Sequence, residues 1–383
     1  MCAIYSYSLS GLTFTENLFK VSNTHFQNHI SGVKNLIDTC MQVMPGDRVL
    51  MVLEPADQSF YDPAVGALIE KELTRAGAKV SVLRPEIVSN PIALPEHVSV
   101  AMGQSEHTLF LSRLGDYARF TPMTGNSAVA ICYARQLSML DSPFSGVSHN
   151  LMSRLLQKLE DELLQARHWR ITCELGTDLQ GSFCWPSHEG GIDDDFSMTL
   201  FPVMTFKPVP CNTTSGNAAL SRWLMPVAAA KVDPAVVSFD GIVNARVEDG
   251  QITGLSGNDK AVQQVTDYYN LVSSTLGTER NRIHSWHVGI NPFTAYTGNA
   301  DVNLEDWGAI SFASPRYLHF HTCGDVPPGE IAWSIFNPTV FVDGQCFWES
   351  GQFCWLQRED NIALINETVG AQCLLGESAD IGI

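Results

Sequence analysis

The sequence predicts an α/β N-terminal domain, a parallel sheet flanked by helices, followed by a C-terminal domain of mainly antiparallel β structure. Residues 1–166 alternate short apolar strand-like segments with helix-like segments, which is the order of parallel βαβ units. From residue 167 onward, short strand-like segments are separated by Gly, Asp, Asn and Pro, which favours hairpins. A chain of 383 residues with 45% hydrophobic residues is long enough for two cores. We therefore expect two domains, 1–166 and 167–383.

The first domain contains clear signals for where its helices begin and end. Asp62 precedes Pro63, which is the pattern of an N-cap followed by proline at the first helical position, and Gly77 can end that helix. Apolar residues at helical spacing predict a long helix over 149–166. Neither GxGxxG nor GxxxxGK[ST] occurs, so a nucleotide site has no sequence support. The strands expected in this domain are 47–53, 80–83, 108–111 and 128–132.

The second domain contains three Asp-Gly dipeptides between β-prone segments, at 239–241, 248–250 and 342–344. Asp-Gly is a strong hairpin signal, because both residues tolerate the positive φ of a tight turn. A helix is expected over 258–276, between the first two hairpins and a histidine-containing strand over 283–291.

Charge and composition exclude several classes of function. A formal net charge of −18 gives a surface that repels phosphate backbones, so nucleic-acid binding is not expected. The sequence has no run of about 18 apolar residues and no secretory signal, which predicts a cytoplasmic protein without a membrane segment. Its ten cysteines include no CxxC pair, so zinc ribbons and thioredoxin-type motifs are absent.

Four of the eleven histidines lie in two short segments, as His284 and His287 and as His319 and His321. Side chains alternate between the faces of a strand, so His319 and His321 project from the same face with Cα atoms roughly 6.5 to 7 Å apart. Two imidazoles so placed can share a metal ion. The same alternation puts the side chain of Cys323 on the histidine face, and that of Asp325 too if the strand continues that far.

The third ligand is expected to be His287. If 283–291 is a strand, His287 shares a polar face with Ser285, whereas His284 has the parity of the apolar face. Three imidazoles, or two with the carboxylate of Asp325, make a facial set that leaves coordination positions open. A closed structural zinc site that uses Cys323 is the alternative.

Several segments in order resemble the M29-type aminopeptidase superfamily, and most closely its 2,5-dihydroxypyridine 5,6-dioxygenase branch. They read GDRVLMVLEPADQ, AVGALIEKELTRAGAKVSVLRP, ARHWRITCELGTDLQGSF, FDGIVNARVEDGQITGLSG, HVGINP, HFHTCGD and NPTVFVDGQCFWESGQF, and they span about residues 45 to 355. The resemblance implies an α/β domain followed by a β-rich domain that carries the metal. For the dioxygenase branch it implies one Fe(II) held by two histidines and an aspartate, and a homo-oligomer.

The sequence departs from the family pattern at three places. His319 matches the first residue of the family's His-x-Asp ligand pair, whereas His321 replaces the aspartate. Residues 220–226 carry no carboxylate where the peptidases have a Gly-Glu ligand pair, which argues against a dinuclear peptidase centre.

The histidine that the dioxygenases are proposed to use as a base is also missing from the corresponding segment, FLSRLGDYARF. Arg113 and Asp116 are the nearest polar candidates for contact with substrate. His188, in a glycine-rich loop, is a further candidate that could reach the metal from the opposite side.

The expected activity is that of a mononuclear non-heme Fe(II) oxygenase. Its substrates would be O2 and a small chelating organic molecule, such as an aromatic heterocycle or a modified amino acid. One alternative is an M29-like metallo-aminopeptidase or another metal-dependent hydrolase. A second alternative is a catalytically degenerate family member that binds zinc.

Overall fold

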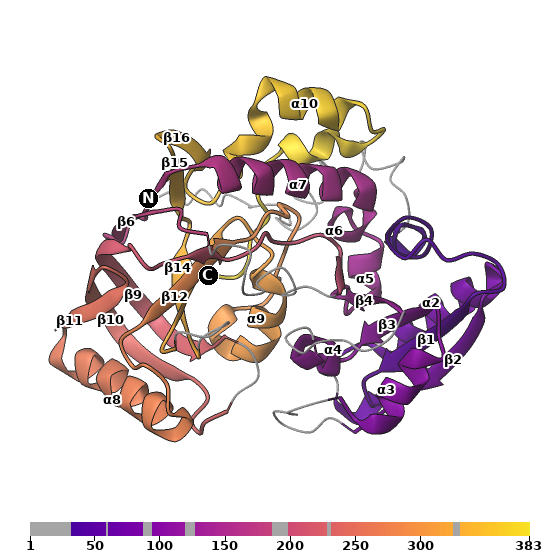
Figure 1. The fold of residues 1–383 in the computed structure, drawn as a ribbon, viewed down its shortest axis with the longest axis horizontal. Helices are drawn as coiled ribbons and strands as arrows, with labels where there is room; N and C mark the ends of the chain where they lie inside the picture. Colours follow the sequence, from indigo (N-terminus) through magenta and orange to yellow (C-terminus); the bar gives the residue numbers. More distant parts are fainter. Residues whose placement is uncertain are drawn as a thin grey trace, which may run out of the picture.

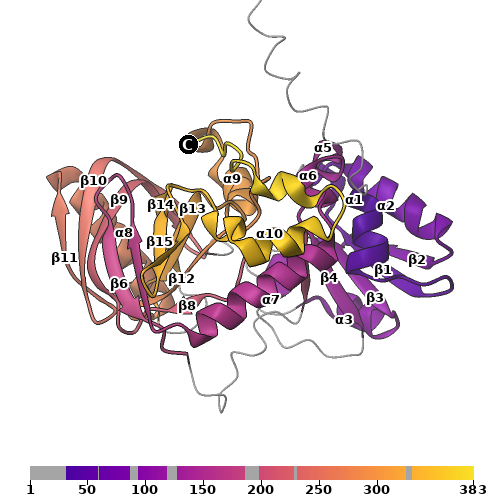
Figure 2. The same cartoon turned by 90° about the horizontal axis from the view of Figure 1, so that it is seen from above.

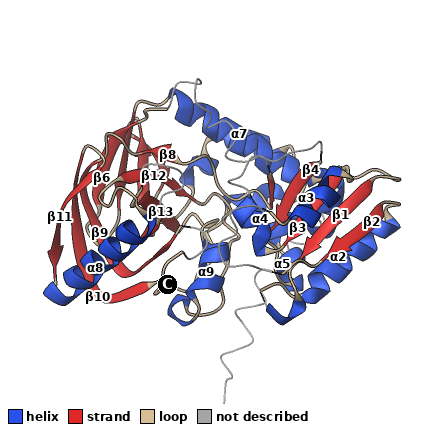
Figure 3. Ribbon diagram, turned by 60° about the horizontal axis from the view of Figure 1, so that its bottom comes forward, coloured by secondary structure: helices blue, strands red, loops and turns tan. Residues whose placement is uncertain are grey.

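The computed structural model describes residues 32–58, 60–86, 94–118, 127–185, 198–227, 231–324 and 330–383. Two β-sheets lie side by side along the long axis of the molecule, as Figure 1 shows. Helices cover the first sheet, whereas the second sheet is curled and carries fewer helices (Figure 3). Both parts of the predicted fold class are therefore confirmed.

The first sheet has five parallel strands in the order β2-β1-β3-β4-β7. Its strands are β1 (Arg48–Leu53), β2 (Lys79–Leu83), β3 (His107–Leu111), β4 (Ala128–Cys132) and β7 (Thr199–Phe201). The helical segments up to residue 165 are α1 (Gly32–Lys34), η1 (Asn35–Cys40), η2 (Ala56–Gln58), α2 (Pro63–Arg75), α3 (Glu96–Gly103), α4 (Arg113–Ala118), α5 (Leu137–Leu140), α6 (Pro143–Gly146) and α7 (His149–Gln165). The edge strand β7 comes from beyond residue 167, so the chain returns to the first sheet after leaving it.

Strand β1 explains why this sheet is covered on both faces. Val49 and Met51 pack in a core with Ile69 of α2, whereas Leu50 packs in a second core with Val98 of α3. A run of apolar residues without alternation is typical of an interior parallel strand. The helix between β1 and β2 begins as predicted, because the Asp62 carboxylate accepts a hydrogen bond from the Ala64 N–H at 2.9 Å.

The second sheet has eleven strands, and all of its ladders are antiparallel. Its main order is β16-β15-β5-β6-β9-β14-β13-β12-β8, and β10 pairs with both β9 and β11. The strands are β5 (His168–Thr172), β6 (Asp178–Ser182), β8 (Val209–Pro210), β9 (Ser215–Pro226), β10 (Val237–Glu248), β11 (Gln251–Gly257), β12 (Ile283–Val288), β13 (Tyr317–Thr322), β14 (Ile331–Phe336), β15 (Thr339–Val342) and β16 (Gln345–Trp348). The helical segments are α8 (Asp259–Leu276), η4 (Ala300–Val302), α9 (Leu304–Ser311), η5 (Cys354–Gln357), α10 (Glu359–Asn366) and η6 (Ala371–Leu375).

Two of the three Asp-Gly dipeptides form hairpins. Asp249 and Gly250 join β10 to β11, and Asp343 and Gly344 join β15 to β16, all with positive φ as a tight two-residue turn requires. The third prediction is wrong. Gly241 lies inside β10, at a shift of register against β9, so its positive φ forms a bulge rather than a hairpin.

The two faces of the second sheet have different environments. Phe320 and Trp333 belong to the main core together with Tyr269 of α8. On the other face, Tyr317 packs with Trp307 of α9, whose ring centroid lies 4.8 Å away. Figures 1 and 2 place α9 between this sheet and the first domain. The face of β13 that carries Tyr317 is therefore turned toward the junction of the two domains.

Helix α7 runs from the first domain along the second one and packs beside α10 (Figure 2). Its buried leucines, including Leu155 and Leu159, contribute to the core of the second sheet. Within the described ranges, no helix combines the length and the apolar content that a membrane span needs.

Candidate metal centre

Three histidines from two adjacent strands gather on one buried face. Strands β12 and β13 are antiparallel, with His287 opposite His319 and Ser285 opposite His321. Residues directly opposite each other in such a pair project from the same face. The side chains of His287, His319 and His321 are 7%, 7% and 4% exposed, and one ligand nitrogen from each lies within 4.8 Å of the others.

The chemistry of this group fits a bound cation. The Nε2 atoms of His287 and His319 are only 2.6 Å apart. Two imidazole nitrogens at that distance cannot both direct lone pairs at each other, so either one ring donates its Nε2 proton to the other or both nitrogens bind the same metal ion. One metal ion could accept a lone pair from each of the three buried imidazoles, whereas one shared proton satisfies only two of the nitrogens.

Two hydroxyl groups fix the orientation of the rings. Thr205 Oγ1 lies 2.9 Å from Nδ1 of His287, and Ser285 Oγ lies 3.0 Å from Nδ1 of His321. Each contact engages the Nδ1 side and leaves Nε2 as the remaining ligand nitrogen. Such partners of the far ring nitrogen set the tautomer and direction of metal-binding histidines.

His284 is outside the group but is linked to it. Its Nδ1 lies 2.8 Å from Ser285 Oγ, which also contacts His321. A register shift between Ile283 and Ser285 places His284 in an irregular part of the ladder, and its side chain is half-buried. The structure therefore brings His287 rather than His284 together with the pair on β13, as strand parity predicted.

Aromatic rings form the walls beside the histidines. The ring of Tyr317 stacks on His319 with centroids 5.1 Å apart, and Phe206 meets His287 edge-on at 6.5 Å. Burial raises the pKa of Tyr317 to about 12, so this side chain remains a neutral phenol. Its hydroxyl lies 3.3 Å from Ser334 Oγ. These rings contribute to the burial of His287 and His319.

The expectation that Cys323 shares the histidine face is wrong. Cys323 has a φ of 60°, which breaks the alternation of the strand, and its side chain lies in the core on the opposite face. Its Sγ lies 3.3 Å from Thr278 Oγ1, and burial raises the pKa of the thiol. A zinc site that uses Cys323 as its fourth ligand is not supported.

Arg113 lies at the junction of the domains rather than in the histidine group. Its guanidinium contacts the buried carboxylate of Glu54 at 2.6 Å and Glu305 of α9 at 2.7 Å. It also lies over the ring of Phe60 at 4.7 Å. Asp116 accepts a hydrogen bond from the Tyr133 hydroxyl at 2.5 Å. Their predicted contact with substrate stays a prediction.

The two remaining candidates, Asp325 and His188, lie outside the described residues. Sequence reasoning missed Thr205, which lies 82 positions before its partner His287 and carries no local signal of that role. Tyr317 could have been found, because it precedes His319 by two positions on the same strand.

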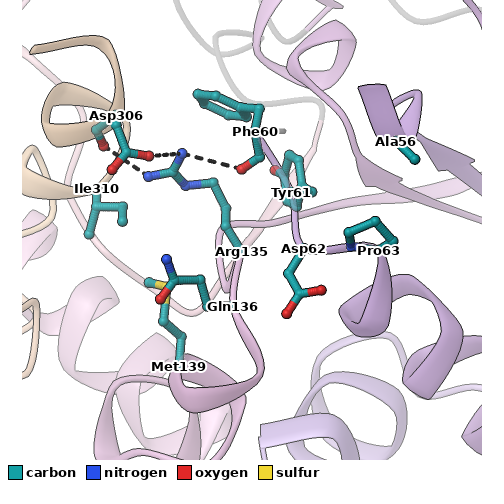
Figure 4. A pocket seen from close by; sticks show the side chains of 10 residues that line it. All are labelled: Ala56, Phe60, Tyr61, Asp62, Pro63, Arg135, Gln136, Met139, Asp306 and Ile310. Atoms are coloured by element: carbon teal, nitrogen blue, oxygen red, sulfur yellow. Dashed lines mark hydrogen bonds and ion pairs between the residues drawn. The ribbon is translucent and has the colours of Figure 1, made fainter. Parts of the chain in front are cut away.

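A pocket of about 290 Å³ lies between the first domain and α9, and its lining includes Phe60, which Arg113 also contacts. Figure 4 shows Arg135 reaching across to Asp306, with the two side chains 2.8 Å apart, and hydrogen-bonding to the backbone oxygen of Phe60. Arg135 also lies 4.3 Å from the centre of the Phe60 ring. Two arginines of the first domain therefore hold the first turn of α9 against it.

Comparisons with known proteins support the fold. The structure is similar to that of 2,5-dihydroxypyridine dioxygenase from Pseudomonas putida, with a TM-score of 0.59 and 14% sequence identity over 86% of this chain and 98% of that one. The chain shares the fold of that dioxygenase. AmpT from Thermus thermophilus gives a TM-score of 0.48 and 12% identity over 84% of this chain and 98% of that one. No family model and no curated protein matches the sequence. The resemblance inferred from the ordered segments is thus confirmed as structural similarity at low sequence identity.

Proposed function

We propose that the protein is a mononuclear non-heme Fe(II) oxygenase that acts, with O2, on a small chelating organic molecule. The observation that carries the proposal is the buried group of His287, His319 and His321, whose ligand nitrogens lie within 4.8 Å of one another. Its fold, shared with 2,5-dihydroxypyridine dioxygenase, supports the proposal at the level of architecture.

The ligand set favours an open mononuclear centre. Within the described residues the group consists of three histidines, without a carboxylate that could bridge two metals. Three protein ligands leave coordination positions for substrate and dioxygen, whereas a structural zinc site closes with four. This difference makes a dinuclear hydrolase and a structural zinc protein the weaker alternatives.

His287, His319 and His321 would hold the metal, and bound Fe(II) would supply a site where a chelating substrate and O2 exchange electrons. The protein's own residues would orient the histidine rings and keep solvent away from the metal. Thr205 and Ser285 fix the direction of two rings through their Nδ1 atoms. Tyr317 and Phe206 line the imidazoles with aromatic surface, which keeps solvent from the ligand nitrogens.

The test is anaerobic reconstitution of the metal-free protein with Fe(II). We expect one iron per chain, and oxygen consumption that depends on a chelating substrate from a panel of hydroxylated heterocycles and modified amino acids. His321→Ala should bind iron at least about 100-fold more weakly, because it removes a ligand. His168→Ala, which changes an exposed histidine on β5, serves as the matched control and should bind like the wild type.

The alternatives give different results in the same experiment. Peptide or amide hydrolysis with Zn(II) or Co(II), without oxygen consumption in the presence of iron, would establish a hydrolase. One tightly bound zinc per chain that neither substrate nor O2 affects would establish a structural site. Failure to bind any divalent metal would refute the proposal altogether.

A further inference from the structure

A second pocket, of about 210 Å³, lies between α7 and the segment 198–207. Helix α7 contributes His149, Ser153, Leu156 and Glu160 to it. These positions are separated by four, three and four residues, so they line one face of the helix. His149 and Thr205 are buried and belong to the floor, whereas Ser153, Leu156 and Glu160 are only half-buried. The pocket therefore opens to solvent along the helix.

His149 lines this pocket and contains an unsatisfied polar atom. Its side chain is 8% exposed, and among the described residues its buried Nδ1 has no hydrogen-bond partner. Buried polar atoms without a partner are uncommon and cost free energy, so each requires an explanation. Burial also lowers the pKa of His149, which keeps the imidazole neutral at pH 7. The free nitrogen of a neutral ring can accept a hydrogen bond from a ligand hydroxyl, or donate one to it in the other tautomer.

The remaining walls favour an uncharged aromatic ring. Leu156, Met198 and Met204 present apolar surface, and methionine sulfur makes favourable contacts with aromatic rings. A cavity of about 150 Å³ holds benzene in another protein, so this volume holds one ring with a polar substituent. Glu160 and Lys207 both line the pocket, so their charges offset each other, and the net charge of −18 of the whole chain disfavours an anion.

We propose that this pocket binds a small neutral aromatic alcohol of one ring, with its hydroxyl hydrogen-bonded to His149 Nδ1. The site is separate from the proposed metal centre. Thr205 lines the pocket and contacts Nδ1 of His287, whereas His319 faces Nε2 on the other side of that ring. The proposal does not rest on the proposed function, because the pocket is complete without a metal.

Phenol and toluene are matched probes, since they have nearly the same size and differ in the hydroxyl group. We titrate each into the full-length, metal-free protein and follow binding by ligand-observed NMR. Phenol should bind saturably with a dissociation constant of about 1 mM, as expected for a ligand of a few heavy atoms. Toluene should bind about tenfold more weakly, because it leaves His149 Nδ1 unsatisfied.

Two variants locate the binding. His149→Phe keeps a ring but removes the nitrogen, and it should bring the affinity for phenol down to that for toluene. Leu156→Trp fills the pocket and should abolish the binding of both probes, whereas the exposed-site control His168→Phe should change neither. Non-saturable phenol binding, or equal affinity for phenol and toluene in the wild type, would overturn the proposal, and this comparison needs no variant to fold.

Discussion

Replacing Ser285 by alanine would measure what the orientation of the imidazoles contributes to metal binding. Ser285 is 1% exposed, and its Oγ lies between Nδ1 of His321 at 3.0 Å and Nδ1 of His284 at 2.8 Å. The substitution removes one oxygen atom and leaves the strand intact. It therefore frees the His321 ring without removing a candidate metal ligand.

The size of the effect follows from the burial of the site. Loss of a partner that orients a ligating histidine weakens metal binding by about 10- to 100-fold. Because His321 is 4% exposed, water cannot readily replace the hydroxyl. We therefore expect the upper half of that range, about 30- to 100-fold, which corresponds to about 2.0 to 2.8 kcal/mol.

The assay is a competition titration of metal-free protein with Co(II) or Zn(II) against a chromophoric chelator. Ser145→Ala is the matched control, because Ser145 is fully buried and its Oγ has no hydrogen-bond partner among the described residues. It should change the metal affinity by less than about twofold. If Ser285→Ala is folded by near-UV circular dichroism and also binds within about twofold of the wild type, the argument that this hydroxyl orients His321 is refuted.

Three further changes test the fold. Gly289→Ala should lower the free energy of unfolding by at least about 3 kcal/mol, because a Cβ there would lie 2.0 Å from the Ala313 carbonyl carbon; a loss below about 1 kcal/mol in urea titrations would contradict this packing. Asn258→Ala should cost about 1 kcal/mol in the same assay, since the Asn258 side chain caps α8, whereas Asn258→Asp should retain the stability. His149→Phe should make stability less sensitive to acid. Burial lowers the pKa of His149 from its ordinary value of 6.5, so below that pH the unfolded chain binds a proton that the folded chain does not, and the wild type loses stability as the pH falls. Equal losses for both proteins between about pH 7.5 and pH 5.5 would show that His149 does not carry this effect.

The elements that sequence predicts well are those with local signals. The strand predicted over 128–132 and the one found coincide, because the segment is an uninterrupted apolar run that includes Val129 and Ile131, which have high β propensity. The helix predicted over 258–276 begins at its N-cap Asn258 and ends at Gly277, which has a φ of 70°. Alternation along the strands 283–291 and 317–322 likewise predicts three histidines on one face, where the structure has them.

The features that sequence does not predict depend on distant parts of the chain. Whether an Asp-Gly pair turns the chain or bulges depends on the neighbouring strand, and Gly241 lies against β9 rather than at a free end. The position of Cys323 depends on one backbone angle that alternation cannot supply. Thr205 meets His287 only because the chain between them folds back, so periodicity carries no trace of that contact.

Because the chain returns to the first sheet, the first half of the protein cannot be replaced independently of the second. Strand β7 pairs with β4 in the first domain, and Thr205 follows it by four residues before reaching His287 in the second. The Thr205 hydroxyl, which orients the candidate ligand His287, thus follows a strand whose ladder partner, β4, belongs to the other half. A chimera that takes residues 1–166 from another protein would need to preserve the pairing of β4 with β7, or it would change the candidate metal centre without altering any of its three histidines.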